Sequence, residues 1–380
     1  MDHGMIKFNL NLIKMTLINT PFILSILFTI LTVFSSCNEQ KNTNATPLEL
    51  EKKSIGKTVY ELDSKATLIY QDKNNNYWFS SKEKGVYKYN GKNLILYTSK
   101  DGLISYSILG IQEDKRGNLF FDTPDGVNKF DRQQFTTLKI IEGENEWKLE
   151  PNDLWFRIGW NNNGPYRYDG KNLFHLKFPK SQLEDEFYSK YPNISYNPYG
   201  IYSIYKDHKG TLWFGTSSLG IYRFDGEKIS WMYEKLLTET PEGGSFGIRS
   251  IIEDKEGYFW ICNSTYKYKI LPDETVDNET NLINYKREKG IENNRKKNLY
   301  FMSMTIDNHN DLWMISYNDG IWKNNGKELI QYPIKNEEKE ILLFAIYNDN
   351  QGNLWIATHN DGTYKYNGET FEKFKLTIPK

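Results

Sequence analysis

The chain has 380 residues, of which 48 are lysine or arginine and 49 are aspartate or glutamate, so its formal net charge is −1. This balance, without a long run of either sign, excludes a basic protein that follows a nucleic-acid backbone. Only two cysteines occur, which excludes a disulfide-rich fold and requires a large apolar core. Aromatic residues make up 15% of the chain and favour pleated, half-buried strands.

The N-terminus has the features of an export signal. Residues 21–34 read PFILSILFTILTVF, an uncharged apolar run preceded by Lys7 and Lys14. A run of this length fits the hydrophobic part of a signal peptide better than a membrane-spanning helix. Residues 33–37, VFSSC, end the run and resemble the lipobox of bacterial lipoproteins, in which small residues precede a cysteine that is lipidated and becomes the new N-terminus.

The lipobox resemblance implies that residues 1–37 are a lipoprotein signal peptide and that Cys37 is the lipidation site. Phe34 stands where the lipobox most often has leucine. A plain secretory signal, with Cys37 present by chance, is therefore the alternative. The segment before the apolar run is long, so Met5 and Met15 are alternative initiators.

One sequence pattern recurs along the rest of the chain. It consists of an apolar stretch, an aspartate, a polar turn, a tryptophan six residues after the aspartate, a glycine, and an aromatic residue near Asn-Gly or Asp-Gly. The clearest copies are residues 207–226 and 349–368. In the third copy Leu149 replaces the aspartate, and in the second copy Phe120 replaces the tryptophan. The repeated tryptophans are Trp78, Trp155, Trp213, Trp260, Trp313 and Trp355.

Each copy is too short for a mixture of helices and strands, and turn residues divide it into four β-segments. In the fourth copy these are residues 201–206, 211–216, 220–224 and 228–233. Four-stranded sheets repeated at this period form the blades of propellers. We therefore predict an all-β fold, a seven-bladed β-propeller of four-stranded blades over residues 57–380, with the tryptophans packed between blades. Residues 38–56 are polar, lack aromatics and predict a flexible tether.

The repeats resemble those of the two-component regulator propeller family. The family signature runs Asp, turn, Gly-Asn-Leu-Trp, then small-Thr and Gly-Leu-aromatic; residues 352–358 (GNLWIAT) and 210–216 (GTLWFGT) match it closely, and residues 117–123 (GNLFFDT) match with Phe for Trp. Family propellers often form the periplasmic sensing half of hybrid sensors, ahead of a further β-domain, a membrane span and a kinase. The seventh copy ends close to the C-terminus, so we expect no output domain here and a signal that passes to a separate membrane signalling or transport protein.

Position within the repeat argues against catalytic roles. Cys262 falls where other copies carry Ser, Gly or Ala, which predicts a small buried side chain. Three histidines fall at positions where other copies carry Lys, Arg, Asn or Ser, and we predict that they are surface turn residues: His208, His309 and His359. The aspartate turns lack the glutamate that completes a calcium loop, and no two histidines have metal-ligand spacing. We expect no catalytic residue, metal or cofactor.

Departures from the repeat locate a candidate binding site. The third copy has a longer loop, residues 157–165, and the link that follows, residues 179–199, is rich in aromatics. In propellers such loops and links share one face, so both should line one mouth of the central channel. Aromatic rings stack on sugars and asparagines donate and accept hydrogen bonds, which suggests a glycan ligand; the alternative is that these aromatics pack the insertion onto the rim. The candidate ligand-binding residues are Trp160, Asn161, Asn162, Tyr188, Tyr191, Tyr196 and Arg249.

These observations predict a lipid-anchored binding or sensing module of the cell envelope, facing the periplasm or the outer surface. The expected partners are a glycan or another envelope ligand and a separate membrane protein, but no nucleic acid. A propeller-type lyase or hydrolase and a purely structural scaffold are the alternatives. Fold alone does not decide among them. Acidic and histidine side chains converging at one channel mouth would favour the enzyme, and an aromatic, asparagine-rich mouth would favour the binding module.

Overall fold

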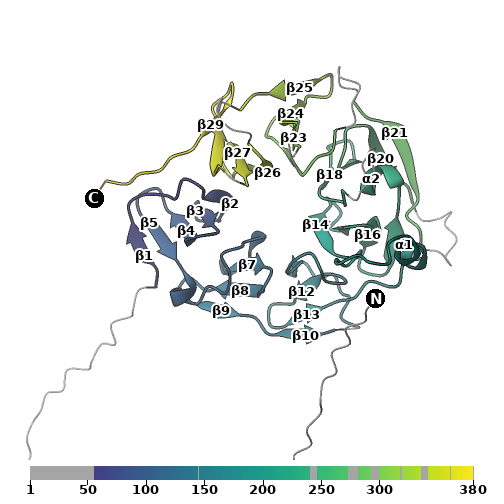
Figure 1. The fold of residues 1–380 in the computed structure, drawn as a ribbon, viewed down its shortest axis with the longest axis horizontal. Coiled ribbons are helices and arrows are strands. Elements are labelled where there is room, and N and C mark those ends of the chain that lie inside the picture. The colour runs from purple at the N-terminus through teal and green to yellow at the C-terminus, as the bar shows by residue number, and fades with distance from the viewer. Residues whose placement is uncertain are drawn as a thin grey trace, which may run out of the picture. The chain divides into compact units, whose positions relative to one another are not determined.

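The computed structural model describes residues 55–379, except 144, 240–245, 273–280, 292–298, 317–318, 335–340 and 360. These residues form seven β-sheets arranged as blades around a central axis (Figure 1). The predicted all-β, seven-bladed propeller is confirmed. The predicted signal peptide, Cys37 and nearly all of the predicted tether lie outside the described residues. Within the described part, no helix has the length and apolar character needed to cross a membrane.

In six of the blades, four strands follow one another both in the chain and in the sheet. Blades 1 and 2 consist of β2 (Thr67–Gln71), β3 (Tyr77–Ser81), β4 (Gly85–Tyr89), β5 (Leu94–Tyr97), and of β6 (Gly110–Glu113), β7 (Leu119–Thr123), β8 (Gly126–Phe130), β9 (Phe135–Thr137). Blades 4 and 5 consist of β14 (Ile201–Lys206), β15 (Leu212–Thr216), β16 (Ile221–Phe224), β17 (Ile229–Met232), and of β18 (Ile251–Glu253), β19 (Tyr258–Ile261), β20 (Tyr266–Ile270), β21 (Tyr285–Lys289). Blades 6 and 7 consist of β22 (Ser303–Ile306), β23 (Leu312–Ile315), β24 (Ile321–Asn324), β25 (Leu329–Tyr332), and of β26 (Leu343–Asn348), β27 (Leu354–Thr358), β28 (Thr363–Tyr366), β29 (Phe371–Lys373).

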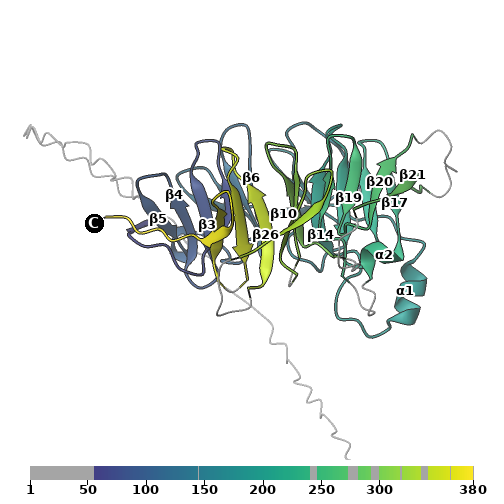
Figure 2. The ribbon, with the colours of Figure 1, turned by 90° about the horizontal axis from the view of Figure 1, so that it is seen from above.

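Two sheets depart from this pattern. β1 (Lys57–Val59) pairs antiparallel with β5 and adds a fifth, outermost strand to blade 1. Blade 3 is built from β10 (Ile140–Glu142), β11 (Leu154–Phe156), β12 (Tyr166–Tyr168) and β13 (Leu173–His175), in the order β10-β13-β12-β11. Three short helices lie in the connections: η1 (Ser99–Asp101), α1 (Glu184–Lys190) and α2 (Lys235–Thr238). Figure 2 shows α1 and α2 on the same face of the ring.

The spacing of six residues between aspartate and tryptophan has a direct structural cause. In blade 4, Asp207 Oδ1 accepts hydrogen bonds from the turn nitrogens of Lys209 and Thr211, at 3.0 and 2.8 Å. The other oxygen, Oδ2, accepts one from the Trp213 indole at 2.9 Å. The aspartate therefore forms the turn, as predicted, and also holds the tryptophan, which the repeat pattern alone did not reveal. The same indole bond recurs in blades 1, 5, 6 and 7, from Trp78, Trp260, Trp313 and Trp355.

Blade 3 shows what happens without the aspartate. Leu149 takes its place in the sequence, and the buried indole nitrogen of Trp155 has no hydrogen-bond partner in the described structure. Trp147 packs against Trp155 instead, with ring centroids 6.1 Å apart. Aromatic packing thus replaces the polar bond that fixes the tryptophan in the other blades.

The tryptophans pack each blade against the next, as predicted. Trp78 of blade 1 contacts Phe121 of blade 2 with centroids 5.6 Å apart, and Trp213 of blade 4 contacts Phe259 of blade 5 at 4.5 Å. At the junction of blades 7 and 1, Trp355 contacts Tyr77 at 5.6 Å. Because each large ring fills the space between two sheets, the core is distributed around the ring rather than placed at its centre.

Side chains and backbone close the ring between the last and the first blade. Thr363 Oγ1 accepts a hydrogen bond from the Leu68 nitrogen at 2.7 Å, and Tyr77 donates its hydroxyl to Asp349 Oδ2 at 3.0 Å. The Leu62 nitrogen donates to the Leu376 carbonyl at 3.0 Å, so the C-terminal segment runs beside the start of blade 1.

Candidate ligand-binding site

Blade 3 has no strand next to the channel axis. β11 carries Trp155, and in the other blades the corresponding residue of the repeat lies on the second strand from the axis. In blade 3, however, β11 is the edge strand nearest the axis, and no described strand lies inside it. The fourth strand, β10, pairs in parallel with β13 on the opposite edge. In the described chain between Gly143 and Gly200, apart from residue 144, no further strand pairs with β11. The innermost position of this blade is therefore filled by something other than a strand.

The Arg157 side chain spans the gap between the two neighbouring blades. Its Nη1 donates to the Tyr202 carbonyl of blade 4 at 2.8 Å, and its Nη2 donates to the Leu109 carbonyl at the start of blade 2 at 2.6 Å. One guanidinium thus links the inner strands of the two neighbouring blades across the gap. Its fixed fork of donors suits this bridge.

Asp122 of blade 2 contacts both the backbone and the side chain of Arg157. Its carboxylate accepts hydrogen bonds from the backbone nitrogens of Arg157 and Ile158, at 3.1 and 3.0 Å, and lies 4.0 Å from Arg157 Nε. Burial raises the pKa of Asp122, while the charge of Arg157 acts in the opposite direction. The pair fixes the first turn of the long loop that follows β11.

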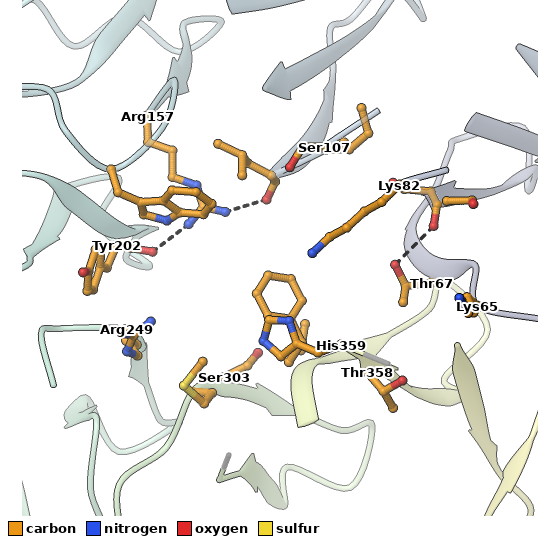
Figure 3. Close-up of a pocket in the computed structure, with 18 of the residues that line it drawn as sticks. Lys65, Thr67, Lys82, Ser107, Arg157, Tyr202, Arg249, Ser303, Thr358 and His359 are labelled. Atoms are coloured by element: carbon orange, nitrogen blue, oxygen red, sulfur yellow. Dashed lines mark hydrogen bonds between the residues drawn. The ribbon is translucent and has the colours of Figure 1, made fainter. Parts of the chain in front are cut away.

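A cavity of about 650 Å³ opens at one end of the channel, and residues of all seven blades line it (Figure 3). Its wall is formed by the starts of the inner strands and by the loops after the second strands. This volume lies in the range of ligand-binding pockets. The residues that line it are Lys65, Thr67, Ser80, Ser81, Lys82, Glu83, Ser107, Ile108, Leu109, Arg157, Trp160, Tyr202, Arg249, Met302, Ser303, Phe344, Ala345, Thr358 and His359.

Trp160 brings a large aromatic side chain to this cavity. It belongs to the loop between β11 and β12, lines the cavity and is 43% exposed. Ile158 and Gly159, at φ values of +46° and +86°, form the turn that leads to it. Gly200 packs against its backbone, since a Cβ at Gly200 would lie 1.7 Å from the Trp160 carbonyl oxygen.

Arg249 lines the cavity from blade 5, just before β18, as expected from its place at the start of an inner strand. Its guanidinium lies 4.5 Å from the ring centroid of Tyr202, and its Nε donates to the Phe246 carbonyl at 2.8 Å. The charge is held in place by an aromatic face and a carbonyl. No carboxylate of the described residues forms an ion pair with it.

The other candidate residues lie elsewhere in the insertion. The side chains of Asn161 and Asn162 hold the loop itself: Asn161 Oδ1 accepts from the Asn197 nitrogen at 2.6 Å, and Asn162 donates to the Ile158 carbonyl. Tyr188 and Tyr191 contact Phe187 of α1, and the Tyr196 hydroxyl contacts Ser218. None of these five residues lines the cavity. The structure therefore joins only Trp160 and Arg249 of the predicted set around it.

Two cavity residues were missed from the sequence. His359 follows β27 and Lys82 follows β3, each four residues after the repeated tryptophan, and both line the cavity. His359 is an exposed residue of the loop after β27, as expected, and it also lines the cavity because the loops after the second strands border the channel mouth. Its position in the repeat was the available signal, since it shares that position with Lys82.

The charge around the cavity is mainly positive. Burial lowers the pKa of His359, and the positive charges of Lys82 and Arg249 lower it further, so the neutral form of the imidazole is favoured. Lys65 pairs with Glu83 at 3.1 Å. Lys82 and Arg249 thus contribute two cations that no described carboxylate neutralises.

Cys262 lies beneath this wall rather than in it. The residue is fully buried and its backbone φ is +54°. Burial raises the pKa of its thiol to about 11. A neutral, inaccessible thiol agrees with the predicted role as a small packing residue.

A family model described as two component regulator propeller matches residues 195–218 and 339–360. These stretches contain the aspartate turn and the tryptophan of blades 4 and 7. The chain carries two-component regulator propeller repeats. The resemblance seen in the sequence is therefore confirmed for these two blades. No curated protein matches the sequence.

Solved structures share the propeller fold. The extracellular domain of a putative one component system from B. thetaiotaomicron is 18% identical, with a TM-score of 0.51 over 81% of this chain and 39% of that chain. Virginiamycin B lyase from Staphylococcus aureus is 14% identical, with a TM-score of 0.54 over 81% of this chain and 97% of the lyase. This chain thus spans about two fifths of that extracellular domain, and both likenesses concern the fold.

Proposed function

We propose that this protein is a ligand-binding or sensing module of the cell envelope, anchored through lipid on Cys37, and that its ligand binds at the channel mouth. The observation that carries this proposal is the cavity itself. Every blade contributes to its wall, and Trp160, 43% exposed, lines it together with Lys82 and Arg249. A concave site with one exposed aromatic ring and a few polar groups is the usual form of a small-molecule site.

A glycan is the proposed ligand class. An exposed indole offers an apolar face against which a sugar ring stacks, while serine hydroxyls in the same cavity supply hydrogen bonds. Ser80, Ser107 and Ser303 line the same cavity. The extracellular domains of two B. thetaiotaomicron sensor systems have the same fold, in agreement with a sensing role at the envelope.

We propose binding rather than catalysis. His359 and Glu83 both line the cavity, but Glu83 forms an ion pair with Lys65, and cations surround His359. In the described residues, no group of three or more His, Cys, Asp or Glu side chains is placed to hold a metal ion. The lyase alternative is tested in the binding experiment, because catalysis would consume the retained glycan and release product.

The test is a glycan-array screen of the full chain in detergent, with Trp160→Ala and Tyr191→Ala. We expect the wild type and Tyr191→Ala to retain the same glycans, because Tyr191 directly follows α1 and does not line the cavity. Trp160→Ala should lose about tenfold or more in affinity, since it removes the stacking face. Absence of binding to every glycan, or equal binding by Trp160→Ala, would contradict the proposal.

The lipid anchor has its own test. Two or more acyl chains hold a protein stably on a membrane. We therefore expect the full chain, expressed in a bacterium with lipoprotein-processing enzymes, to fractionate with membranes and Cys37→Ser to become soluble. Retention of Cys37→Ser in the membrane fraction would show that Cys37 is not the anchor.

A further inference from the structure

We propose that the ligand at the channel mouth is an acidic saccharide, whose carboxylate or sulfate group lies among Lys82, Arg249 and His359 while its ring stacks on Trp160. This inference rests on the proposed function and names the chemistry of its ligand. Carboxylate and sulfate groups are both oxyanions with several oxygens that accept hydrogen bonds.

The first argument is the charge balance of the cavity. Five basic side chains line it, Lys65, Lys82, Arg157, Arg249 and His359, against one carboxylate, Glu83. Glu83 forms an ion pair with Lys65, and Arg157 forms one with Asp122. The remaining cations, Lys82 and Arg249, have no carboxylate partner among the described residues.

The second argument is the convergence of these cations. Lys82 comes from blade 1, Arg249 from blade 5 and His359 from blade 7. The positive charges of Lys82 and Arg249 nevertheless both lower the pKa of His359. Basic side chains from three blades therefore lie around the same cavity, close enough for their charges to interact (Figure 3). Like charges repel, so this arrangement costs stability unless an anion neutralises it.

The third argument is the position of the arginine head. Arg249 Nε donates to the Phe246 carbonyl, and the ring of Tyr202 supports the planar group. The terminal nitrogens keep donors beyond the bond to Phe246, and a guanidinium fork matches an oxyanion in two-point contact. Arg157, in contrast, uses both terminal nitrogens on backbone carbonyls and serves as part of the wall.

The neutral imidazole completes the site. His359 contacts the ring of Phe344 at a centroid distance of 4.8 Å, and Lys82 and Arg249 are the charged groups of the cavity wall that act on it. A neutral imidazole can donate one hydrogen bond to an oxyanion. It can do so without adding a third full positive charge to the empty site.

The test compares three oligosaccharides by isothermal titration calorimetry with the full chain in detergent. The probes are a galacturonic acid trisaccharide, its methyl ester and a sulfated galactose disaccharide. We expect at least one acidic probe to bind about tenfold or more tightly than the neutral ester, and its affinity to fall as salt is raised. If neither acidic probe binds more tightly than the ester, the inference alone is overturned.

Variants separate the site from general charge effects. Lys82→Gln and Arg249→Gln should each weaken the acidic probe about tenfold or more and leave the ester unchanged. Lys92→Gln is the control, because Lys92 is exposed in the β4–β5 turn and does not line the cavity. Circular dichroism confirms that each variant folds. Failure of all three probes to bind would contradict the proposed function as well, whereas an unchanged affinity in Lys82→Gln would refute the site assignment.

Discussion

Arg157→Ala should lower the free energy of unfolding by about 3 kcal/mol, the lower end of the cost of removing one partner of a buried charge pair, because the Arg157 side chain is partly exposed and its Nε lies 4.0 Å from Asp122. The variant loses the two bonds that join blades 2 and 4 and leaves the carbonyls of Leu109 and Tyr202 without their donor. Asp122 remains as a buried carboxylate beside an empty space. The measurement is the urea unfolding midpoint and slope of the full chain.

Two variants refine this first prediction. Arg157→Lys keeps the charge but lacks the fork that reaches both carbonyls, so we expect an intermediate loss. Arg157→Leu combined with Asp122→Asn removes both charges and should be less destabilising than Arg157→Ala. A loss below about 0.5 kcal/mol for Arg157→Ala, the range of ordinary surface substitutions, would show that the arginine does not replace the missing strand.

Gly200→Ala should destabilise the protein by about 2–3 kcal/mol and also weaken ligand binding, because overpacking against backbone forces the chain apart. The added Cβ would lie 1.7 Å from the Trp160 carbonyl oxygen and 3.1 Å from that of Asn197. The loop that presents Trp160 would have to move away from the link before β14. Stability and glycan affinity should therefore fall together in urea unfolding and in the array screen.

Gly110→Ala is the matched control for this second prediction. Gly110 lies in β6, and a Cβ there would meet no heavy atom within 4 Å. The substitution should be neutral or stabilising by up to about 1 kcal/mol, because alanine lowers the conformational entropy of the unfolded chain. Full glycan affinity in Gly200→Ala would indicate that the Trp160 loop is not positioned by this contact.

The regular part of the fold was accessible from the sequence because each blade repeats a local pattern. In blade 4, every predicted strand boundary agrees with the structure within one residue; β15, for example, spans Leu212–Thr216 where 211–216 was expected. Aspartate turns, glycines at positive φ and alternating apolar residues are all local signals. The added strand β1 has no such signal, since its pairing with β5 depends on a distant partner.

The irregular parts were not accessible, because they depend on contacts between blades. The third copy of the repeat showed only a lost aspartate and a longer loop, and nothing local indicated that its inner strand is absent or that Arg157 bridges the gap. Aromatic composition likewise did not separate Trp160, at the cavity, from Tyr188 and Tyr191, which pack around Phe187. Which side chain faces the channel is decided by how the ring closes.

The most direct test of the central claim is a lysine acylation footprint of the full chain, read by mass spectrometry, with and without a saturating mixture of neutral and acidic oligosaccharides. A ligand at the channel mouth should slow acylation of Lys82, which lines the cavity, and leave that of Lys92 unchanged. Unchanged acylation of Lys82, or equal protection of both lysines, would contradict a binding site at the channel mouth.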